Sequence, residues 1–188
     1  ISIVAQPIIS KELFNQSVFL NFNYTDTLER VYNIPAGNIL YIHGKACSAD
    51  NLIIGHHDLS GFQEERISAF NAAEEHGIYM DDVEEDVRLT EAKEIIKEYF
   101  KKTYKDTASI LEKNQGFFDS LSGLNEIFIL GHSLSAIDMD YFRKIREKVS
   151  PLCKWYISYH ENKDIIRSQL LVKELNIYDY QLIRIENL

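Results

Sequence analysis

The sequence predicts an α/β protein with a mostly parallel sheet, and three observations lead to this fold class. Short apolar runs alternate with segments of helical periodicity, which is the order of elements in a parallel α/β sheet. Small or polar residues follow these runs at three places: Asn23, His43–Gly44 and Gly131–Ser135. The chain has 188 residues, 45% of them hydrophobic, and 3 prolines, so it can bury a sizeable core.

The first predicted elements are two strands joined by a short helix. Val18–Phe22 is an apolar run that ends in polar residues, which is typical of a buried strand. Thr25–Tyr32 has the pattern of a short helix, which Thr25 or Asp26 can cap. After a turn at residues 33–37, Ile39–Ile42 is the second predicted strand.

The middle of the chain has a different pattern. Leu52–Gly55 is a third short apolar run, but residues 61–118 contain no convincing strand. Acidic residues between 81 and 86 precede a long helical pattern, and they fit a solvated loop and the start of a helix. We therefore expect residues 57–122 to form a helical insertion within one domain that spans residues 1–188.

Alternating strands and helices return in the last third of the chain. Ile127–Leu130 is the next predicted strand, and Ser135 with Asp138 resembles a capping box before a helix that Pro151 ends. Three more elements are predicted: a strand at Lys154–Tyr159, a helix capped by Asn162 that reaches Leu175, and a strand at Leu182–Ile185.

Charge and cysteine content restrict the partners and the compartment. The chain has 20 basic and 29 acidic residues, a net charge of −9, so we expect no nucleic-acid partner. No apolar run reaches the length of a membrane span, so no membrane partner is expected. Cys47 and Cys153 have no C-x-x-C spacing, which favours two buried, reduced thiols in a cytoplasmic protein over a zinc site or a disulfide.

The polar residues after the strands indicate a ligand site, because ligands of parallel sheets bind at the carboxyl ends of strands. His43 can act there as a general base or be a satisfied structural residue. Asn23 can bind a ligand or cap the following helix. His56–His57 has no Glu or Cys at a spacing typical of zinc sites, so no metal is predicted.

The segment Gly131–Ser135 allows two interpretations. It resembles the nucleophile elbow G-x-S-x-G, but Ser135 stands where the second glycine belongs. A serine hydrolase also needs an acid and then a His after Ser133, and the candidates match this order loosely: Asp138 or Asp164 with His160. The second interpretation is a loop between a strand and a helix whose amides and hydroxyls hold a nucleotide ribose or phosphate.

Four segments appear in an order and combination that is fairly specific. They are FLNFNYTDTLE (Phe19–Glu29), ILYIHG (Ile39–Gly44), NLIIGH (Asn51–His56) and IFILGHSLSAIDMD (Ile127–Asp140). Together they resemble the bacteriophage abortive infection AbiH family, which is similar in turn to the SIR2-like superfamily of sirtuin deacylases and NAD-hydrolysing defence domains. The resemblance spans about Val18 to Asp164 and implies a Rossmann-like, mostly parallel α/β sheet.

The resemblance also implies roles for individual residues. Asn23 and His43 would be catalytic: Asn23 would contact the nicotinamide ribose or the attacking water, and His43 matches the His of the H-G pair. The positions implied to bind the nucleotide are Asn23, Tyr24, Gly44, Gly131, Ser133, Leu134 and Asp138. The Asp of the superfamily's T-T-N-Y-D segment falls on Thr25, and Asp26 follows one residue later.

Two parts of the SIR2-like pattern are missing from the sequence. The four-cysteine zinc module of sirtuins is absent, and residues 61–118 occupy the corresponding region. The glycine-rich loop that opens these families, G-N-G-F-D in AbiH-like chains, has no counterpart, because no Gly precedes Gly37. We therefore expect this chain by itself to lack the first strand and the phosphate loop, to bind NAD poorly and to be inactive alone.

The function that the resemblance implies is cleavage of NAD, as substrate, to nicotinamide and ADP-ribose in antiphage defence. The alternative is a nucleotide-binding or sensing module without catalysis. A third reading is a protein-interaction piece in which the acidic helical insertion contacts a partner. The phage trigger and the formation of a homo-oligomer stay open.

Overall fold

The computed structural model describes residues 16–48, 52–55, 95, 98 and 105–187. The chain divides into two compact units, residues 1–52 with 107–188, and residues 53–106. None of the helices in the described part is long and apolar enough to cross a membrane. The insertion predicted at 57–122 falls mostly on residues outside the described ones and stays a prediction, while residues 107–122 belong to the first unit. The elements below all belong to that first unit.

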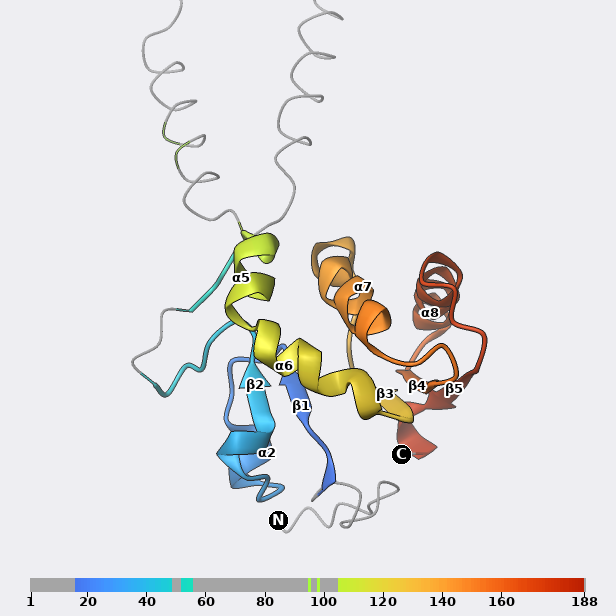
Figure 1. Cartoon of the computed structure of the whole chain (residues 1–188), viewed down its shortest axis with the longest axis horizontal. Helices are drawn as coiled ribbons and strands as arrows, with labels where there is room; N and C mark the ends of the chain where they lie inside the picture. Colours follow the sequence, from blue (N-terminus) through green and yellow to red (C-terminus); the bar gives the residue numbers. More distant parts are fainter. Residues whose placement is uncertain (1–15, 49–51, 56–94, 96–97, 99–104, 188) are drawn as a thin grey trace, which may run out of the picture. The chain divides into compact units, whose positions relative to one another are not determined.

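The first sheet of this unit is a pair of parallel strands (Figure 1). Its region contains, in chain order, β1 (Phe19–Asn21), α2 (Thr27–Arg30), the 3-10 helix η1 (Ala36–Asn38) and β2 (Ile39–Tyr41). Both predicted strands are confirmed, although each is shorter than expected. Helix α2 ends before the predicted Tyr32, because Asn33 has a left-handed backbone (φ 56°) and Ile34 N–H donates to Leu28 O (3.1 Å). The apolar run at 52–55 has no regular secondary structure.

The second sheet has three parallel strands in the order β3–β4–β5. Its region contains β3 (Glu126–Ile129), the 3-10 helix η3 (Ala136–Asp138), α7 (Met139–Lys148), β4 (Lys154–Tyr159), α8 (Asn162–Glu174), β5 (Tyr180–Arg184) and the 3-10 helix η4 (Ile185–Asn187). In register, Ile127 pairs with Trp155, which pairs with Tyr180. A helix returns the chain between each pair of neighbouring strands, so the predicted α/β class with parallel sheets is confirmed.

The core of the unit gathers side chains from the second sheet and from the helices around it. Helices α5 (Thr107–Lys113) and α6 (Gln115–Asp119) and the 3-10 helix η2 (Ser120–Gly123) precede β3. The largest fully buried side chains come from α6, α7, β4 and α8: Phe118, Tyr141, Trp155, Ile157 and Leu171. Burial of this many large apolar groups is the dominant favourable contribution to folding.

Two helix caps predicted in the last third of the chain are wrong, and side-chain contacts explain both. In the first helix, Asp26 takes the N-cap position as predicted, but its side chain makes no cap hydrogen bond. Ser135 precedes η3 and Asp138 precedes α7, but neither makes a side-chain cap hydrogen bond. The Asp138 carboxylate faces two histidines instead. Helix α8 is capped by Glu161 rather than Asn162, because Glu161 and Asp164 each accept the other's backbone N–H in a capping box.

Two further expectations need correction. The last strand is Tyr180–Arg184 rather than Leu182–Ile185, because backbone pairing with β4 already begins at Tyr180, in a polar stretch that hydrophobicity does not reveal. Cys153 is buried as predicted, but Cys47 is exposed. Cys47 lies in the polar turn after β2, where the neighbouring residues are exposed too.

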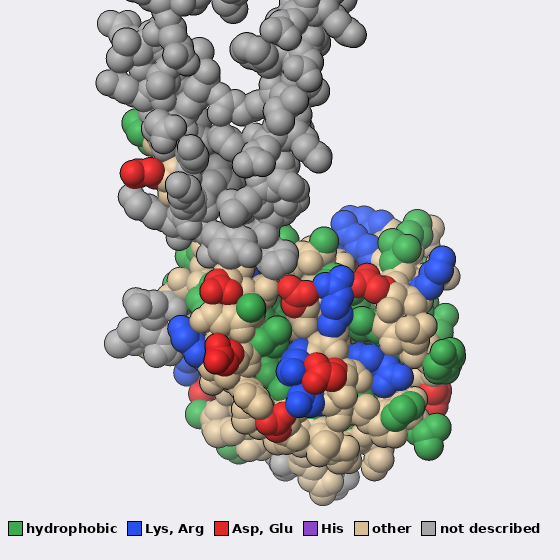
Figure 2. All heavy atoms as spheres, turned by 45° about the horizontal axis from the view of Figure 1, so that its top comes forward, with side chains coloured by type: hydrophobic (Ala, Val, Ile, Leu, Met, Phe, Trp, Pro, Cys, Tyr) green, Lys and Arg blue, Asp and Glu red, His purple; other side chains and the backbone are tan. Residues whose placement is uncertain are grey.

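The outward face of α7 carries both signs of charge. Arg143 pairs with Asp140 at 2.6 Å and with Glu174 of α8, and Lys144 pairs with Glu147 at 3.0 Å. Figure 2 shows Lys and Arg side chains interspersed with Asp and Glu on the face that it displays. This face therefore offers no extended surface of one charge for a strongly charged partner.

Candidate functional site

Three segments that follow parallel strands meet beside α7. Phe22 follows β1, His43 follows β2 and His132 follows β3. The ring centroid of Phe22 lies 5.6 Å from that of His43 and 4.4 Å from that of His132. Tyr141 and Phe142 of α7 add rings 5.6 Å and 5.8 Å from Phe22. Aromatic side chains therefore surround polar groups at the carboxyl ends of strands from both sheets, the place where ligands of parallel sheets bind.

The polar centre of this site is an imidazole–carboxylate cluster of His43, His132 and Asp138. His43 Nε2 lies 3.8 Å from Asp138 Oδ1, and His132 Nε2 lies 3.5 Å from Asp138 Oδ2. The three side chains are 7%, 12% and 14% exposed, in the order His43, His132, Asp138. One carboxylate therefore faces two imidazoles, one through each oxygen, in a place that solvent barely reaches.

The loop after β3 is held in a defined shape by two hydrogen bonds. Gly131 has a positive φ of 63°, and its N–H donates to Oγ of the buried Ser158 on β4 (2.8 Å). Leu134 has a φ of 51°, which is unusual for a bulky side chain, and its N–H donates to His132 Nδ1 (2.9 Å). Because Nδ1 must offer a lone pair to accept this bond, the proton of the neutral His132 ring sits on Nε2, the nitrogen that faces Asp138.

His43 is placed by the end of the first sheet. Ile42 N–H donates to Asn21 O (3.1 Å), which extends the contact between β1 and β2 up to the histidine. Gly44 has a φ of 87° and its N–H donates to Tyr41 O (3.1 Å), so Ile42 and His43 are the central residues of a turn that ends at Gly44. The positive φ explains why a glycine follows His43, since other residues rarely adopt this backbone conformation. The turn leaves the His43 imidazole buried beside α7.

The charge of Asp138 acts on the two tyrosines of the site. Burial, and after it the negative charge of Asp138, raises the pKa of Tyr24 above its ordinary value. Burial also raises the pKa of Tyr141, with further contributions from Asp138 and Asp140. Both hydroxyls therefore stay protonated at physiological pH. Their rings lie 6.3 Å and 5.7 Å from that of His43.

The structure brings together some of the residues predicted from the sequence. His43, Asp138 and Tyr24 lie in or against the cluster, and the backbone of Gly131 and Leu134 shapes its loop. Gly44 forms the turn next to it.

Two predicted residues, Asn23 and Ser133, have exposed side chains. Asn23 lies between Phe22 and Tyr24, whose rings both pack against His43, and its N–H donates to Oδ1 of the buried Asn21 (3.0 Å).

Sequence reasoning missed His132. The residue lies inside the segment Gly131–Ser135, in which the predicted roles were assigned to the glycine and the hydroxyls. The signal that could have found it is a second histidine directly after a predicted strand, in the same position relative to the sheet as His43. Phe22 and Tyr141 were also missed as parts of the site, because aromatic residues at these spacings are equally typical of a core.

The acid and histidine candidates of the serine-hydrolase interpretation do not contact one another as a catalytic triad would. His160 Nδ1 lies 2.8 Å from Glu186 Oε1, with an exposed side chain, and Asp164 accepts the N–H groups of His160 and Glu161. Asp138 faces His43 and His132 instead. His56–His57 lies outside the described residues, and no group of three His, Cys, Asp or Glu that could hold a metal occurs among the described ones.

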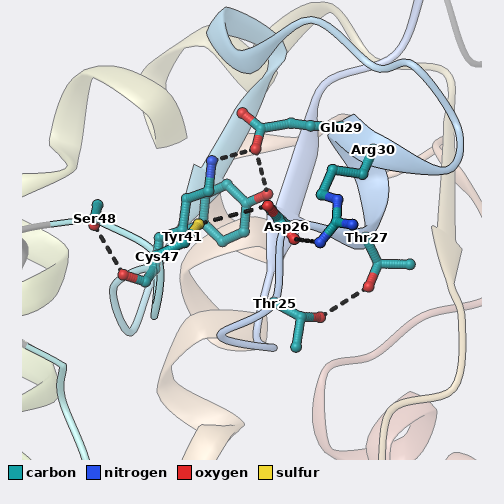
Figure 3. A network of polar contacts seen from close by, with 9 residues as sticks. Thr25, Asp26, Thr27, Glu29, Arg30, Tyr41, Cys47 and Ser48 are labelled. Atoms are coloured by element: carbon teal, nitrogen blue, oxygen red, sulfur yellow. Dashed lines mark hydrogen bonds and ion pairs between the residues drawn. The ribbon is translucent and has the colours of Figure 1, made fainter.

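A second polar group, the Glu29 network, lies beside β2 and consists of Asp26, Glu29, Tyr41, Lys45 and Cys47. The Glu29 carboxylate accepts hydrogen bonds from Lys45 Nζ and Tyr41 Oη, the latter at 3.4 Å, and Cys47 Sγ donates to Asp26 Oδ2 at 3.6 Å (Figure 3). The hydrogen bond to Glu29 raises the pKa of Lys45, and burial followed by the charge of Glu29 raises that of Tyr41. Glu29 and Lys45 therefore form a charge pair near solvent, and Asp26 also lies 3.8 Å from Arg30 Nη1.

The fold and the cluster define a class of protein: an α/β protein with parallel sheets and a polar site at the ends of its strands. Residues 2–159 match the family described as Bacteriophage abortive infection AbiH, so the chain belongs to this family. The predicted resemblance to AbiH proteins is thereby confirmed, and membership implies a part in antiphage defence by abortive infection. No curated protein and no solved structure matches the chain.

Proposed function

We propose that this chain is the α/β part of a SIR2-like hydrolase that cleaves NAD to nicotinamide and ADP-ribose during abortive infection. The observation that carries the proposal is the position of His43, buried at the end of β2 with Nε2 3.8 Å from a carboxylate oxygen of Asp138. An imidazole oriented by a carboxylate is a recurring form of general base. The segments around it are those through which the sequence resembles SIR2-like proteins.

The strand order supports the Rossmann-like part of the proposal. In doubly wound folds the parallel strands run in the order 3-2-1-4-5-6, and the ligand binds where this order reverses. The pair β2–β1 corresponds to strands 3-2, and β3–β4–β5 corresponds to 4-5-6. The place of strand 1 would then lie between β1 and β3, and no strand of the described residues takes it. Phe22 and His132, which follow these two strands, flank the same position.

The proposed reaction is a hydrolysis at the nicotinamide–ribose bond. The bond to nicotinamide breaks with its electron pair, the ribose passes through an oxocarbenium-like state, and a water oxygen bonds to the same carbon. The water's proton leaves through His43, either directly or by way of a ribose hydroxyl, and reaches solvent. Asp138 would stabilise the imidazolium formed at His43, as the acid of a catalytic triad does.

The other residues of the site would bind and orient the substrate. Asn23 would place the water or the ribose through its amide, which both donates and accepts hydrogen bonds. The loop from Gly131 to Leu134, fixed by its hydrogen bonds, would hold the ribose side of the nucleotide through Ser133 and backbone amides. Holding the groups in this geometry is itself a large part of such a catalyst's effect.

The test is release of nicotinamide from NAD by the full-length protein, followed by chromatography. We expect His43→Ala to lower the rate by about a hundredfold or more, the usual contribution of a general base. The matched control is His160→Ala, an exposed histidine paired with Glu186, which leaves the rate unchanged. Intact NAD under every phage trigger, or an equal rate in His43→Ala, would contradict the proposal.

The burial of His43 favours one second candidate, a nucleotide-binding or sensing module without catalysis. Its side chain is 7% exposed and packed against Phe22 and Tyr141, while Asn23, its proposed catalytic partner, is exposed. Calorimetry of the full-length protein with NAD separates the two functions. Saturable binding without nicotinamide release supports the sensing module, and release supports the hydrolase.

A further inference from the structure

We propose that His132 is a positioning residue that acts through Asp138: it holds the carboxylate in the orientation that aligns His43. The proposal rests on the proposed function for its effect on NAD cleavage, but the geometry it invokes can be tested without NAD. Nothing in the sequence pattern assigned a role to His132, and the resemblance placed the function of this loop on Gly131, Ser133 and Leu134.

The first step of the argument is that the His132 ring has one defined orientation. Leu134 N–H donates to Nδ1, so that the nitrogen across the ring points to Asp138 Oδ2. The ring is held edge-on by Phe22 (4.4 Å between centroids, 67° between planes) and by Phe142 (5.0 Å, 78°). A ring held by two aromatic neighbours and at one nitrogen can orient a neighbouring side chain, whereas a mobile surface histidine cannot.

The second step is that Asp138 has no competing helix-capping role. It stands directly before α7, where an Asp side chain commonly accepts a backbone N–H, but it makes no such hydrogen bond. Its backbone is held by the bond from its own N–H to Ser135 O (3.1 Å). The carboxylate is thus directed by its surroundings in the cluster, where each oxygen faces one imidazole.

The third step is that Asp140, the next carboxylate along the chain, is engaged by other partners among the described residues. Asp140, in the first turn of α7, accepts a hydrogen bond from Thr107 (3.0 Å) and pairs with Arg143 (2.6 Å). The raised pKa values of Tyr24 and Tyr141 keep both hydroxyls neutral. Among the described residues, Asp138 is the carboxylate that lies close to both imidazoles, at 3.8 Å and 3.5 Å, so removing one imidazole changes its interaction with the other.

Two substitutions of His132 separate positioning of Asp138 from shaping of the loop. In His132→Asn, the amide oxygen replaces Nδ1 and can accept Leu134 N–H, but nothing reaches Asp138. In His132→Gln, the longer amide places an N–H near the position of Nε2 and can donate to Asp138 Oδ2. The matched control is His160→Asn, the same substitution at an exposed histidine with a different partner.

The first measurement is NMR of the imidazole nitrogens of the full-length protein, which reports the proton position and surroundings of His43 directly. We expect His132→Asn to shift the His43 Nε2 signal, and His132→Gln and His160→Asn to leave it near the wild-type position. An unchanged His43 signal in a folded His132→Asn variant overturns the proposal. So does a shift that is larger in His132→Gln than in His132→Asn.

The second measurement is nicotinamide release. We expect His132→Asn to lower kcat by about a hundredfold with little change in KM, because misplacement of a catalytic group affects the chemical step. His132→Gln should recover at least tenfold of that loss. The reverse order, with Asn better than Gln, would assign His132 to loop shape and overturn the proposal. If the wild-type protein releases no nicotinamide, the proposed function fails while the NMR result still decides the role of His132.

Discussion

The imidazole–carboxylate cluster and the Glu29 network are neighbours along the chain, yet they hold their charges in opposite ways. His43 and Lys45 stand two residues apart after β2. The cluster surrounds one carboxylate with two imidazoles and aromatic rings, and its three side chains are at most 14% exposed. The network joins Glu29 to Lys45 with side chains that are 20% and 22% exposed.

The difference shows how burial determines the strength with which a carboxylate acts on neighbouring groups. Near solvent, water screens an ion pair such as Glu29–Lys45 and side-chain entropy opposes it, so its net contribution to stability is small. In the enclosed cluster the same kind of carboxylate acts over short distances with less screening, and its charge reaches the hydroxyls of Tyr24 and Tyr141. Replacing side chains in each region tests this contrast.

The largest effect is expected for Phe22→Ala, because Phe22 contacts both histidines and both aromatic residues of α7. We expect a loss of about 2–4 kcal/mol in the free energy of unfolding, measured by urea denaturation, together with loss of nicotinamide release. The control is Phe117→Ala. Phe117 is also half-buried and packs on Phe118, so this substitution should lower stability but leave nicotinamide release unchanged. Equal nicotinamide release by Phe22→Ala and Phe117→Ala would show that Phe22 is not part of the functional site.

The next effect concerns the reach of the Asp138 charge. Because this charge raises the pKa of both Tyr24 and Tyr141, Asp138→Asn should lower both values toward the ordinary 10.0. The matched control is Asp140→Asn, which acts on Tyr141 alone. Ultraviolet titration of tyrosinate, with each tyrosine assigned by replacement with Phe, distinguishes the two patterns. A Tyr24 that titrates alike in wild type and Asp138→Asn would contradict the geometry.

A smaller effect is expected in the alkaline stability of the protein. The folded state keeps the Tyr141 proton above pH 10.0, whereas the unfolded chain releases it near that value. A raised pKa in the folded state therefore means that the free energy of unfolding falls as pH rises beyond 10. In Tyr141→Phe this fall should be shallower, as measured by denaturant melts at pH 9 to 11, about the ordinary tyrosine range. An identical slope would show that Tyr141 does not carry the effect.

The smallest effect is expected for Glu29→Gln, which removes the charge of the Glu29 network. We expect a melting temperature close to that of wild type and unchanged nicotinamide release, because an ion pair that water reaches contributes little to stability. The pKa of Tyr41 should fall, since the charge of Glu29 raises it. A loss of stability comparable to that of Phe22→Ala would reverse the contrast between the two regions.

Local patterns in the sequence predicted most of the strands and helices of the first unit. The apolar runs at 39–42 and 127–130 and the strand at Lys154–Tyr159 are examples, because burial of one segment leaves a signature within that segment. The capping box at Ser135 was wrong for the opposite reason: Asp138 is directed by His43 and His132, which are distant in sequence. A local pattern carries no information about such contacts.

The candidate site was predictable to the extent that strand ends coincide in a parallel sheet. That rule placed His43 near the loop of Gly131 and Leu134, and the structure brings them together around Asp138. It could not distinguish which side chain of each segment turns inward. Phe22 and Tyr24 pack against His43 while Asn23 is exposed, and His132 turns inward while Ser133 is exposed. These directions depend on the turn geometry, which positive φ values at Gly44, Gly131 and Leu134 set.

The bond between Gly131 and Ser158 bears on how shortened versions of this protein should be designed. The family match stops at residue 159, the last residue of β4. A chain that ends at residue 159 would retain Ser158. It would lose β5, the strand that pairs with β4, and α8, whose Leu171 is buried. The freed border of β4 would invite pairing between molecules, so crystallisation trials should keep the chain through Arg184.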